Sequence, residues 1–245
     1  MTSEYFFLPR ADVEGSSAVL RGAEYHHLAR VLRVRPGGRV WLFDEDGRRY
    51  RAEAAAVREK EEEIDLSILE VLPPRGVRTR IILAPALLKT GAMDEVILKA
   101  CELGASRISP VESERSVVRA GDHSRRKVER WTRLARAAAK QSRAARVPLI
   151  DAPASLADFL ASGRDGRRIF LCEHGGMSLK SLRGGEEAPP AEATVLVGPE
   201  GGWSAREEEA IRAAEFEAVS LGEAILRAET AALAVLAVLA HEWNW

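Results

Sequence analysis

The sequence has little of what marks secreted, membrane-embedded or disulfide-rich proteins. Only two residues are cysteine, Cys101 and Cys172, and they follow no metal or redox spacing, so a reducing cytoplasm is expected. The N-terminus lacks the basic region and long apolar run of a signal peptide. The longest apolar run, residues 231–240, is far shorter than the roughly 20 residues that span a bilayer. We therefore expect a cytoplasmic protein without a membrane segment.

The sequence also lacks an excess of charge of either sign. It has 36 Lys and Arg residues against 37 Asp and Glu residues, which gives a formal net charge of −1. This balance excludes a histone-like tail, although a basic face can exist within a neutral total. Hydrophobic residues make up 46% of the chain, which is enough for a core and argues against global disorder.

The motifs of several enzyme classes are missing. The five histidines are accompanied by neither HExxH nor CxxC, so we expect no metal site. The sequence contains no GxSxG motif of a serine hydrolase. It also contains neither a Walker loop nor a GxGxxG fingerprint. Chemistry that depends on these motifs is therefore disfavoured.

What is present divides into two regions at Pro73-Pro74-Arg75-Gly76, because two prolines and a glycine after an apolar strand are typical of a linker. Before it the pattern is mostly β. Residues 39–44 and 48–55 flank Glu45-Asp46-Gly47, where Asp-Gly is a strong hairpin signal. One short helix is predicted over 23–31. The pattern predicts a small β-barrel-like domain over 1–72.

After the linker, strand and helix signals alternate. Such alternation is typical of a mostly parallel sheet covered by helices, so we expect an α/β domain over 76–245. The pattern predicts strands over 80–85, 107–111, 169–172, 194–197 and 218–221, and helices over 93–103, 124–145, 156–161, 205–214 and 229–242.

The sharpest motif is VLVGPEGGWS, residues 195–204. A strand runs into a glycine-rich turn and then a helix, whose start is marked by a capping box of Ser204 and Glu207. Glycines let the backbone approach a ligand closely, and ligands of open α/β sheets lie beyond the carboxyl ends of the strands. Glu200 would repel an anion, so the loop suits a ligand with cationic groups or one held by backbone groups. A tight structural turn is the alternative.

A second loop, SLGEAILRAETA at residues 220–231, repeats the pattern of strand, loop and helix. Two such loops in one sheet would form the walls of a single pocket, with Arg227 and Glu229 at its edge near the helix. A structural salt bridge between these two residues is the alternative. The apolar helix over 231–240 is expected to be core or subunit interface rather than a cofactor motif.

Basic residues form two groups. One covers much of the predicted helix over 124–145, outside the apolar stripe that includes Trp131. The other lies beside His26-His27 in the N-terminal region. Two basic surfaces on two domains would suit one phosphate backbone, whereas a solvated helix face is the alternative. The second group comprises Arg30, Arg33, Arg35 and Arg39.

The two loops together resemble a known signature. Residues 198–204, followed by Leu221-Gly222 and residues 225–231, are similar to the signature of the ribosomal RNA small-subunit methyltransferase E family, of the SPOUT class. Weaker similarities follow in the right order. They are His26-His27-Leu28 with Val31-Leu32-Arg33, Lys99 with Glu102-Leu103-Gly104 and Pro110, and Gln141-Ser142-Arg143 with Val147-Pro148. Lys140 departs from the family pattern, which has Glu there, so a local ion pair or the RNA surface is expected to differ.

This resemblance implies a fold that periodicity does not show. Residues 1–72 would form a PUA-like RNA-binding β-barrel, and residues 76–245 a SPOUT α/β domain with a mostly parallel sheet and a deep trefoil knot. The resemblance also implies a homodimer that needs no metal and no membrane. The implied reaction is methyl transfer from S-adenosylmethionine to N3 of a uridine in 16S ribosomal RNA, free or within the small ribosomal subunit.

Other functions stay open at this point. One is a SPOUT enzyme that acts on another RNA base or on transfer RNA. Another is a non-catalytic RNA-binding factor of ribosome assembly, which need not bind S-adenosylmethionine. A nucleotide-phosphate hydrolase is disfavoured by Glu200 and by the missing Lys of a phosphate loop.

Within this resemblance each site residue has an expected role. Arg227 would stabilise the uridinate that forms as N3 loses its proton, and Glu229 or Glu200 would accept that proton or orient Arg227. The cofactor site would comprise Leu171, Val197, Gly198, Pro199, Glu200, Gly201, Leu221, Gly222, Ile225, Leu226, Arg227 and Thr230. RNA contacts are expected from His27, Arg30, Arg33, Lys89, Arg115, Arg119, Gln141 and Arg143.

Overall fold

A computed structural model shows two compact units. The first comprises Met1–Gly76 with Arg136–Val147, and the second Val77–Ala135 with Pro148–Trp245. The division that we expected, into 1–72 and 76–245, differs from this one mainly in residues 136–147, which pack with the first unit. The structure describes residues 5–119, 121, 124–144, 146–163, 165–182 and 188–244, with the side chains of Lys180 and Leu182 left out.

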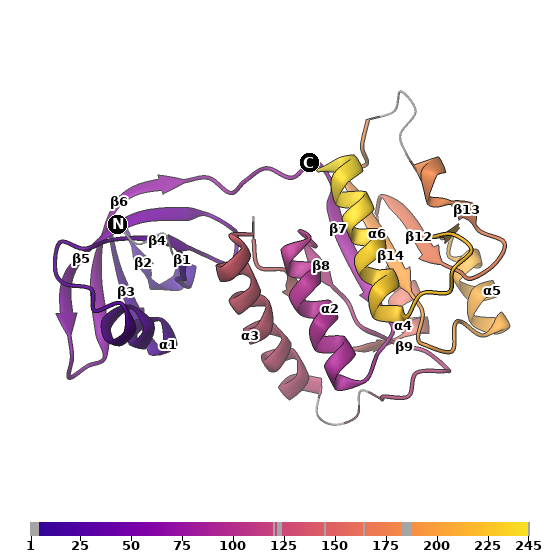
Figure 1. Ribbon diagram of the computed structural model, residues 1–245, viewed down its shortest axis with the longest axis horizontal. Helices are drawn as coiled ribbons and strands as arrows, with labels where there is room; N and C mark the ends of the chain where they lie inside the picture. The colour runs from indigo at the N-terminus through magenta and orange to yellow at the C-terminus, as the bar shows by residue number, and fades with distance from the viewer. Residues whose placement is uncertain are drawn as a thin grey trace. The chain divides into compact units, whose positions relative to one another are not determined.

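The first unit (Figure 1) contains a six-stranded sheet in the order β1-β4-β5-β6-β3-β2. Strands β4, β5, β6 and β3 pair in antiparallel fashion, while β1 runs parallel to β4. The β4–β5 connection turns at Asp46-Gly47, as predicted, and the φ of Gly47 is 81°, a conformation that favours glycine. The elements are β1 (Tyr5–Phe7), η1 (Arg10–Asp12), β2 (Val13–Glu14), β3 (Ser17–Arg21), β4 (Arg39–Phe43), β5 (Arg49–Arg58) and β6 (Glu63–Leu72).

The core of the first unit comes from alternating residues of its strands and from one short helical segment. Ile64 and Leu66, which alternate with polar neighbours in the sequence, are buried in it. The single helix expected over 23–31 is wrong in detail, because α1 (Gly22–Tyr25) is followed by the π-helix η2 (His26–Val31). Tyr25 and Leu28 point into the core from these turns. π-helical turns are rare in proteins, and those that occur are often found at functional sites.

Lys140, the residue that departs from the family pattern, ties the end of α3 (Ser124–Ser142) to the first unit. Its Nζ lies 2.8 Å from Glu24 Oε2, 3.1 Å from His27 Nδ1 and 4.4 Å from the centroid of the Phe6 ring. Of the two consequences expected of this departure, a different local ion pair or a different RNA surface, the structure shows an intramolecular ion pair with Glu24. Two neighbouring cations make similar contacts, Arg136 over Phe7 at 4.5 Å and Arg143 over Tyr5 at 5.8 Å.

The second unit is built on a seven-stranded sheet in the order β10-β8-β7-β14-β12-β15-β13, and all of its pairs are parallel. The predicted parallel sheet is therefore confirmed. Its strands are β7 (Arg80–Pro85), β8 (Arg107–Ile108), β10 (Leu149–Ile150), β12 (Arg167–Leu171), β13 (Met177–Ser178), β14 (Glu192–Val197) and β15 (Glu217–Ser220).

The strand predicted over 107–111 is interrupted at Pro110, which has no N–H for a ladder bond. After it, β9 (Val111–Glu112) pairs instead with β11 (Ala154–Ser155) in a separate two-stranded sheet. The segment that leaves β9 therefore starts close to the carboxyl end of β7, because Leu87 N donates to Val111 O at 2.8 Å.

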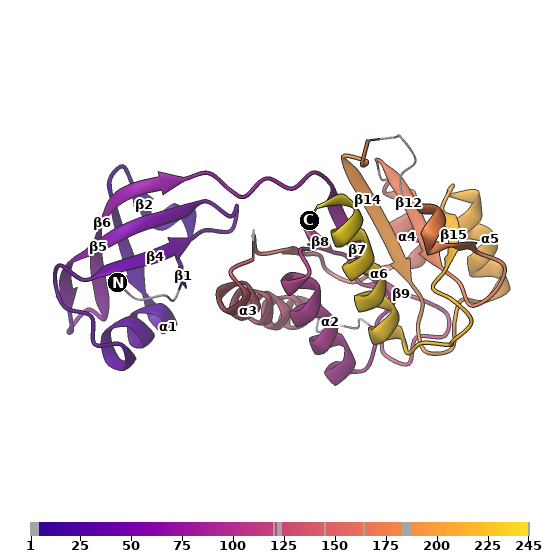
Figure 2. The same cartoon turned by 45° about the horizontal axis from the view of Figure 1, so that its top comes forward.

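Helices α2 (Thr90–Glu102) and α6 (Ala228–Trp243) lie side by side in both views (Figures 1 and 2), and α6 packs on β7 and β14. Helices α4 (Leu156–Ala161) and α5 (Ala205–Ala213) share a core with Phe170 and Leu196. A short turn, η4 (Leu179–Leu182), follows β13. In the part of the chain that the structure describes, no helix is both long and apolar enough to cross a bilayer.

Candidate functional site

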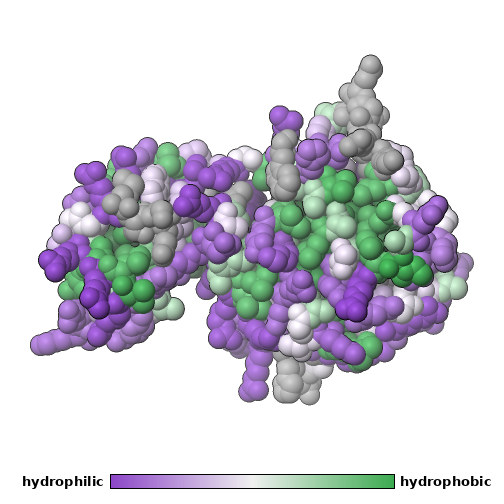
Figure 3. Space-filling model, in the orientation of Figure 1, coloured by the Kyte–Doolittle hydropathy of each residue, from purple (hydrophilic) through white to green (hydrophobic). Residues whose placement is uncertain are grey.

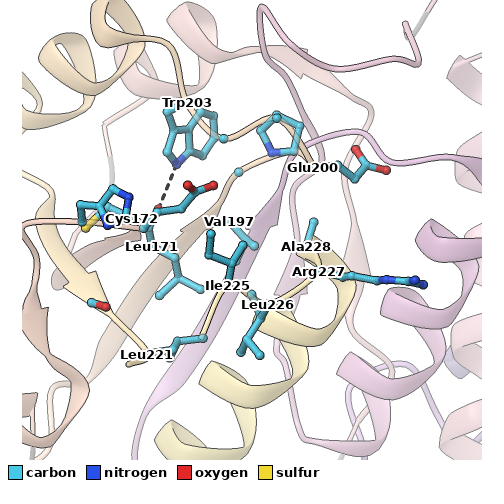
Figure 4. A pocket seen from close by; sticks show the side chains of 18 of the residues that line it. Leu171, Cys172, Val197, Glu200, Trp203, Leu221, Ile225, Leu226, Arg227 and Ala228 are labelled. Carbon is cyan, nitrogen blue, oxygen red and sulfur yellow. Dashed lines mark hydrogen bonds between the residues drawn. The ribbon is translucent and has the colours of Figure 1, made fainter. Parts of the chain in front are cut away.

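A cavity of about 460 Å³ lies at the carboxyl ends of β14, β12 and β15. These strands are neighbours in the sheet, so the loops that follow them converge although they are far apart in the chain. Residues 198–203 follow β14, residues 172–174 follow β12 and residues 221–227 follow β15, and all three segments line the cavity (Figure 4). The volume lies within the range typical of small-molecule sites.

Most residues predicted for the cofactor site line this cavity. The helix α6 begins at Ala228, and its first turn presents Ala228 and Ala231 to the cavity. Residues three apart lie on one helix face, so Thr230, which was predicted for the cofactor site, and Glu229, which was predicted as catalytic, lie outside the lining. The predicted residues in the lining are Leu171, Val197, Gly198, Pro199, Glu200, Gly201, Leu221, Gly222, Ile225, Leu226 and Arg227.

Sequence reasoning missed the loop after β12. It identified Leu171 at the strand end, but Cys172, Glu173 and His174 also line the cavity. The signal was the pair Gly175-Gly176, which follows the end of β12 after three residues. A Cβ on Gly176 would lie 2.6 Å from the Cys172 Sγ atom, so only glycine fits there.

The glycine-rich loop, residues 198–204, is firmly held. The indole Nε1 of Trp203 donates to the Leu171 carbonyl at 3.2 Å, and Trp203 is 6% exposed. A Cβ on Gly198 would lie 3.2 Å from the same indole ring, so glycine allows the loop to close over it. The predicted capping box is confirmed: Glu207 N donates to Ser204 Oγ, and Ser204 N donates to Glu207 Oε2.

The second loop, residues 221–227, is open. Ile225 is 73% exposed and Leu226 36% exposed, which is unusual for large apolar side chains beside a cavity. Among the described residues, the backbone groups of residues 223–226 have no hydrogen-bond partner in the protein. The loop therefore offers apolar side chains and unused backbone donors and acceptors at the same place.

Arg227 and Glu200 lie at one side of this site. Figure 4 shows the Arg227 side chain extending away from Leu171 and Leu221, on the same side as Glu200. Both are exposed. Within the described residues Arg227 forms no ion pair, with Glu229 or with any other acid, so the structural salt bridge considered above is not formed and its guanidinium is available to a ligand.

The charges around the cavity favour a ligand with a cationic part. Carboxylates outnumber guanidinium groups in the lining: Glu173, Glu200, Glu208 and Glu223 stand against Arg115 and Arg227. Burial, followed by the charge of Glu208, raises the pKa of the Cys172 thiol. This thiol is therefore neutral near pH 7 and is a weak nucleophile. In the described ranges, no three His, Cys, Asp or Glu residues are grouped as metal ligands.

The predicted RNA contacts fall into three sets. Arg30 and Arg33 line a second cavity of about 370 Å³ in the first unit, together with Arg35. His27 contacts Lys140 of α3 and Arg143 lies over the Tyr5 ring of β1, as described above, and Gln141 in α3 is exposed. The third set lies in the second unit: Lys89 is exposed before α2, and Arg115 and Arg119 donate to backbone carbonyls.

The arginines of the second cavity differ from those elsewhere in the first unit. Arg21, Arg39, Arg51 and Arg58 each pair with a carboxylate. Among the described residues, by contrast, Arg30, Arg33 and Arg35 have no acidic partner. The backbone φ of Arg33 is 52°, which is uncommon for this residue type, and the buried hydroxyl of Tyr25 in the same lining has no hydrogen-bond partner in the described structure. These features favour an anion as the ligand.

Comparisons with known proteins agree with this geometry. A family model described as "RNA methyltransferase domain" matches residues 76–240, and one described as "RNA methyltransferase PUA domain" matches residues 20–66. The ribosomal RNA small subunit methyltransferase E of Aquifex aeolicus is 31% identical over 92% of this chain and 94% of its own length. That of Synechocystis sp. is 30% identical over 91% of this chain and 72% of its own length.

A solved structure extends the similarity to three dimensions. The ribosomal RNA small subunit methyltransferase E from Neisseria gonorrhoeae, bound to S-adenosyl methionine, superposes with a TM-score of 0.86. It is 29% identical and the match covers 98% of each chain. The two-part architecture, with a PUA-like N-terminal unit and a parallel α/β C-terminal unit, is therefore shared over the whole length.

Proposed function

This chain belongs to the ribosomal RNA small subunit methyltransferase E family, and from that premise we propose that it methylates N3 of a uridine in 16S ribosomal RNA with S-adenosylmethionine. The observation that carries the proposal is the cavity in which the loops after β14 and β15 meet, because these are the loops that bear the family signature. The position that the family activity implies is uridine 1498.

The residues around the cavity fit S-adenosylmethionine. Leu171, Val197 and Ile225 supply apolar surface for an adenine ring, and the unpartnered backbone of residues 223–226 can read its polar edge. The carboxylates of Glu173 and Glu200 complement the ammonium and sulfonium charges. When bound, S-adenosylmethionine supplies an electrophilic methyl group and requires no covalent intermediate on the enzyme.

The chain's own residues supply the remaining chemistry. Uridine N3 is a poor nucleophile until its proton leaves. Arg227 donates hydrogen bonds to the uridine oxygens and so stabilises the anion that develops. Glu200 lines the cavity and accepts the N3 proton. Glu229, the second residue of α6, lies outside the lining and forms no ion pair with Arg227 among the described residues, and we propose that it orients Arg227 once cofactor and RNA are bound. Holding the two reactants in line contributes up to roughly 7–11 kcal/mol.

RNA binding is assigned to the basic surfaces. In the first unit, Arg30, Arg33 and Arg35, which have no acidic partner among the described residues, bind phosphates at the second cavity, and His27, Gln141 and Arg143 contribute further RNA contacts. In the second unit Lys89 contributes beside α2. Each phosphate contact that is lost should lower the slope of log affinity against log salt by about 0.7–0.9.

We further propose that the protein is a cytoplasmic homodimer whose α/β domain, residues 76–245, carries the expected trefoil knot, with residues 1–72 as the RNA-binding domain. Figure 3 shows hydrophobic side chains gathered over α6 on the second unit. Val238 on this helix is 37% exposed and Ile225 is 73% exposed. Exposed apolar patches of this kind mark interaction sites, and a second copy would cover them.

The test is transfer of a labelled methyl group to small-subunit RNA, followed by mass mapping of the modified nucleotide. We expect a single N3-methyluridine, absent from RNA of cells that lack the protein. Methylation of another base, or of transfer RNA, would replace this proposal with the related SPOUT activity. No transfer and no heat of S-adenosylmethionine binding in calorimetry would indicate a non-catalytic assembly factor.

A further inference from the structure

The segment that follows β9, residues 113–119, is bonded to the glycine-rich loop through Arg115, which also lines the cavity. Arg115 Nη1 donates to the Gly201 carbonyl at 2.7 Å and to the Trp203 carbonyl at 3.3 Å. In the described structure this guanidinium has no carboxylate partner. Its Nη1 donors are directed at the backbone of the loop, whereas the sequence predicts that this side chain contacts RNA phosphate.

A buried carboxylate makes the reverse connection. Glu207 is 6% exposed, and each of its oxygens accepts from a backbone N–H. Oε2 accepts from Ser204 at 2.9 Å, and Oε1 accepts from Glu114, 93 residues away in the chain, at 2.7 Å. A buried carboxylate is costly unless it is hydrogen-bonded, so both donors are needed and the two segments are held together.

The segment itself is anchored. Arg119 donates to the carbonyls of Ser113 at 3.0 Å and Glu114 at 3.3 Å, and Lys127 in α3 donates to the Arg119 carbonyl at 2.8 Å. The hydroxyls of Ser113 and Ser116, both buried, lie 3.0 Å apart. These hydrogen bonds form a continuous network, here called the brace, which runs from Lys127 in α3 through residues 113–119 to the glycine-rich loop.

We propose that Arg115 and Glu207 are positioning residues, which fix the glycine-rich loop in its cofactor-binding shape before S-adenosylmethionine arrives. This inference rests on the proposed function. Loops that are already ordered bind a ligand at a smaller entropic cost, so the brace acts on affinity for the methyl donor. We accordingly expect that Arg115 and Arg119 do not contact RNA, because they donate to carbonyls of the protein's own backbone.

The experiment compares two variants with matched controls. Arg115→Ala removes both bonds to the loop, and Glu207→Gln exchanges one acceptor for a donor. Arg206→Ala and Glu209→Gln make the same changes at exposed positions of α5 that have no partner among the described residues. S-adenosylmethionine affinity is measured by calorimetry below the unfolding temperature, and RNA affinity is measured over a range of salt concentrations.

We expect the dissociation constant of S-adenosylmethionine to rise about tenfold in Arg115→Ala and several-fold in Glu207→Gln, as for lost charge-assisted bonds, and to stay constant in both controls. The salt slope for RNA should not change. Arg115→Lys keeps the charge but replaces the planar guanidinium with an ammonium on a shorter side chain that does not reach the position of Nη1, so it should remain impaired in cofactor affinity while RNA binding is normal.

Two results would overturn the inference. One is a salt slope that falls by about one phosphate contact in Arg115→Ala with unchanged cofactor affinity. The other is unchanged cofactor affinity in both folded variants. Failure of the wild-type protein to bind S-adenosylmethionine would instead refute the proposed function. In that case, amide exchange at residue 204 compared between wild type and Arg115→Ala still decides whether the brace orders the loop.

Discussion

The two main walls of the cofactor cavity are built in opposite ways. The loop after β14 is tied to three other segments. Trp203 donates to the Leu171 carbonyl at the end of β12, and Arg115 donates to the carbonyls of Gly201 and Trp203. Glu207 in α5 accepts from the N–H of Ser204. Among the described residues, the loop after β15 has only local bonds, a pair between Ser220 and Gly222 and one from Ala231 N to the Arg227 carbonyl at the start of α6. One wall is thus complete in the free chain, and the other has polar and apolar surface still to be covered.

This difference separates two tasks of the site. A wall that is already ordered gives the methyl donor a fixed binding surface, so no conformational entropy is lost in ordering that wall when the donor binds. An open loop with few internal bonds belongs to the low-stability parts of a protein, from which ligand-binding loops are commonly drawn. Arg227 lies at the end of the open loop, so we expect its final placement to depend on cofactor, RNA or a second subunit.

The largest effect is expected from Arg227→Ala on the open wall. Loss of the guanidinium removes stabilisation of the uridinate, so the methylation rate should fall about 100-fold or more. S-adenosylmethionine affinity should stay within a few-fold of wild type. Single-turnover methyl transfer and calorimetry measure the two quantities, and a wild-type rate in this variant would refute the role of Arg227.

A smaller effect is expected from Ile225→Asp. The change puts a charge at an apolar position of the open wall, and we expect roughly tenfold weaker cofactor binding together with a shift from dimer to monomer. Sedimentation and calorimetry check both. Leu69→Asp is the control, because Leu69 on β6 is also exposed, at 45%, but is far from the cavity in sequence and lies in the first unit. Equal behaviour of the two variants would show that the open wall has no special role.

Cys172 reports on the region between the walls, and Cys101, buried in α2, serves as the internal reference. Burial raises the pKa of Cys101 to about 12, whereas Cys172 is half-buried and lines the cavity. Since only the thiolate reacts, a thiol reagent at pH 8 should label Cys172 first, and faster as the pH rises. S-adenosylmethionine should slow this labelling several-fold. The labelling is measured by mass spectrometry. A labelling rate of Cys172 that S-adenosylmethionine does not change would place the cofactor away from the β12 loop.

The smallest effect is expected from Trp203→Phe on the braced wall. The variant keeps most of the ring but leaves the Leu171 carbonyl without its indole donor, which should lower the free energy of unfolding by about 1 kcal/mol. Denaturant titration measures this change. Trp41→Phe is the control, because Trp41 stacks on Tyr5 and its indole has no hydrogen bond among the described residues. An equal loss in both variants would indicate that ring volume matters and the bond to Leu171 does not.

Local chemistry made much of this molecule predictable. The Asp46-Gly47 turn, the Ser204–Glu207 capping box and the start of α6 depend on residues within a few positions of each other, and all three were visible in the sequence. Lys140 stood out only as a departure from a pattern. Its ion pair with Glu24, 116 residues away, is a tertiary contact that no local rule describes.

The sequence by itself determined the two loops, their glycines and the strands that lead into them, because φ preferences, capping and hydrophobic period act over short distances. Tertiary structure decided which side chains serve those loops. The order β14-β12-β15 brings the Cys172–His174 loop between the two walls, the phase of α6 turns Glu229 and Thr230 away from the cavity, and Arg115 reaches Gly201 across 86 residues. These outcomes depend on how strands cross over and pack, and a hydrogen bond between distant segments leaves no mark in the spacing of the chain.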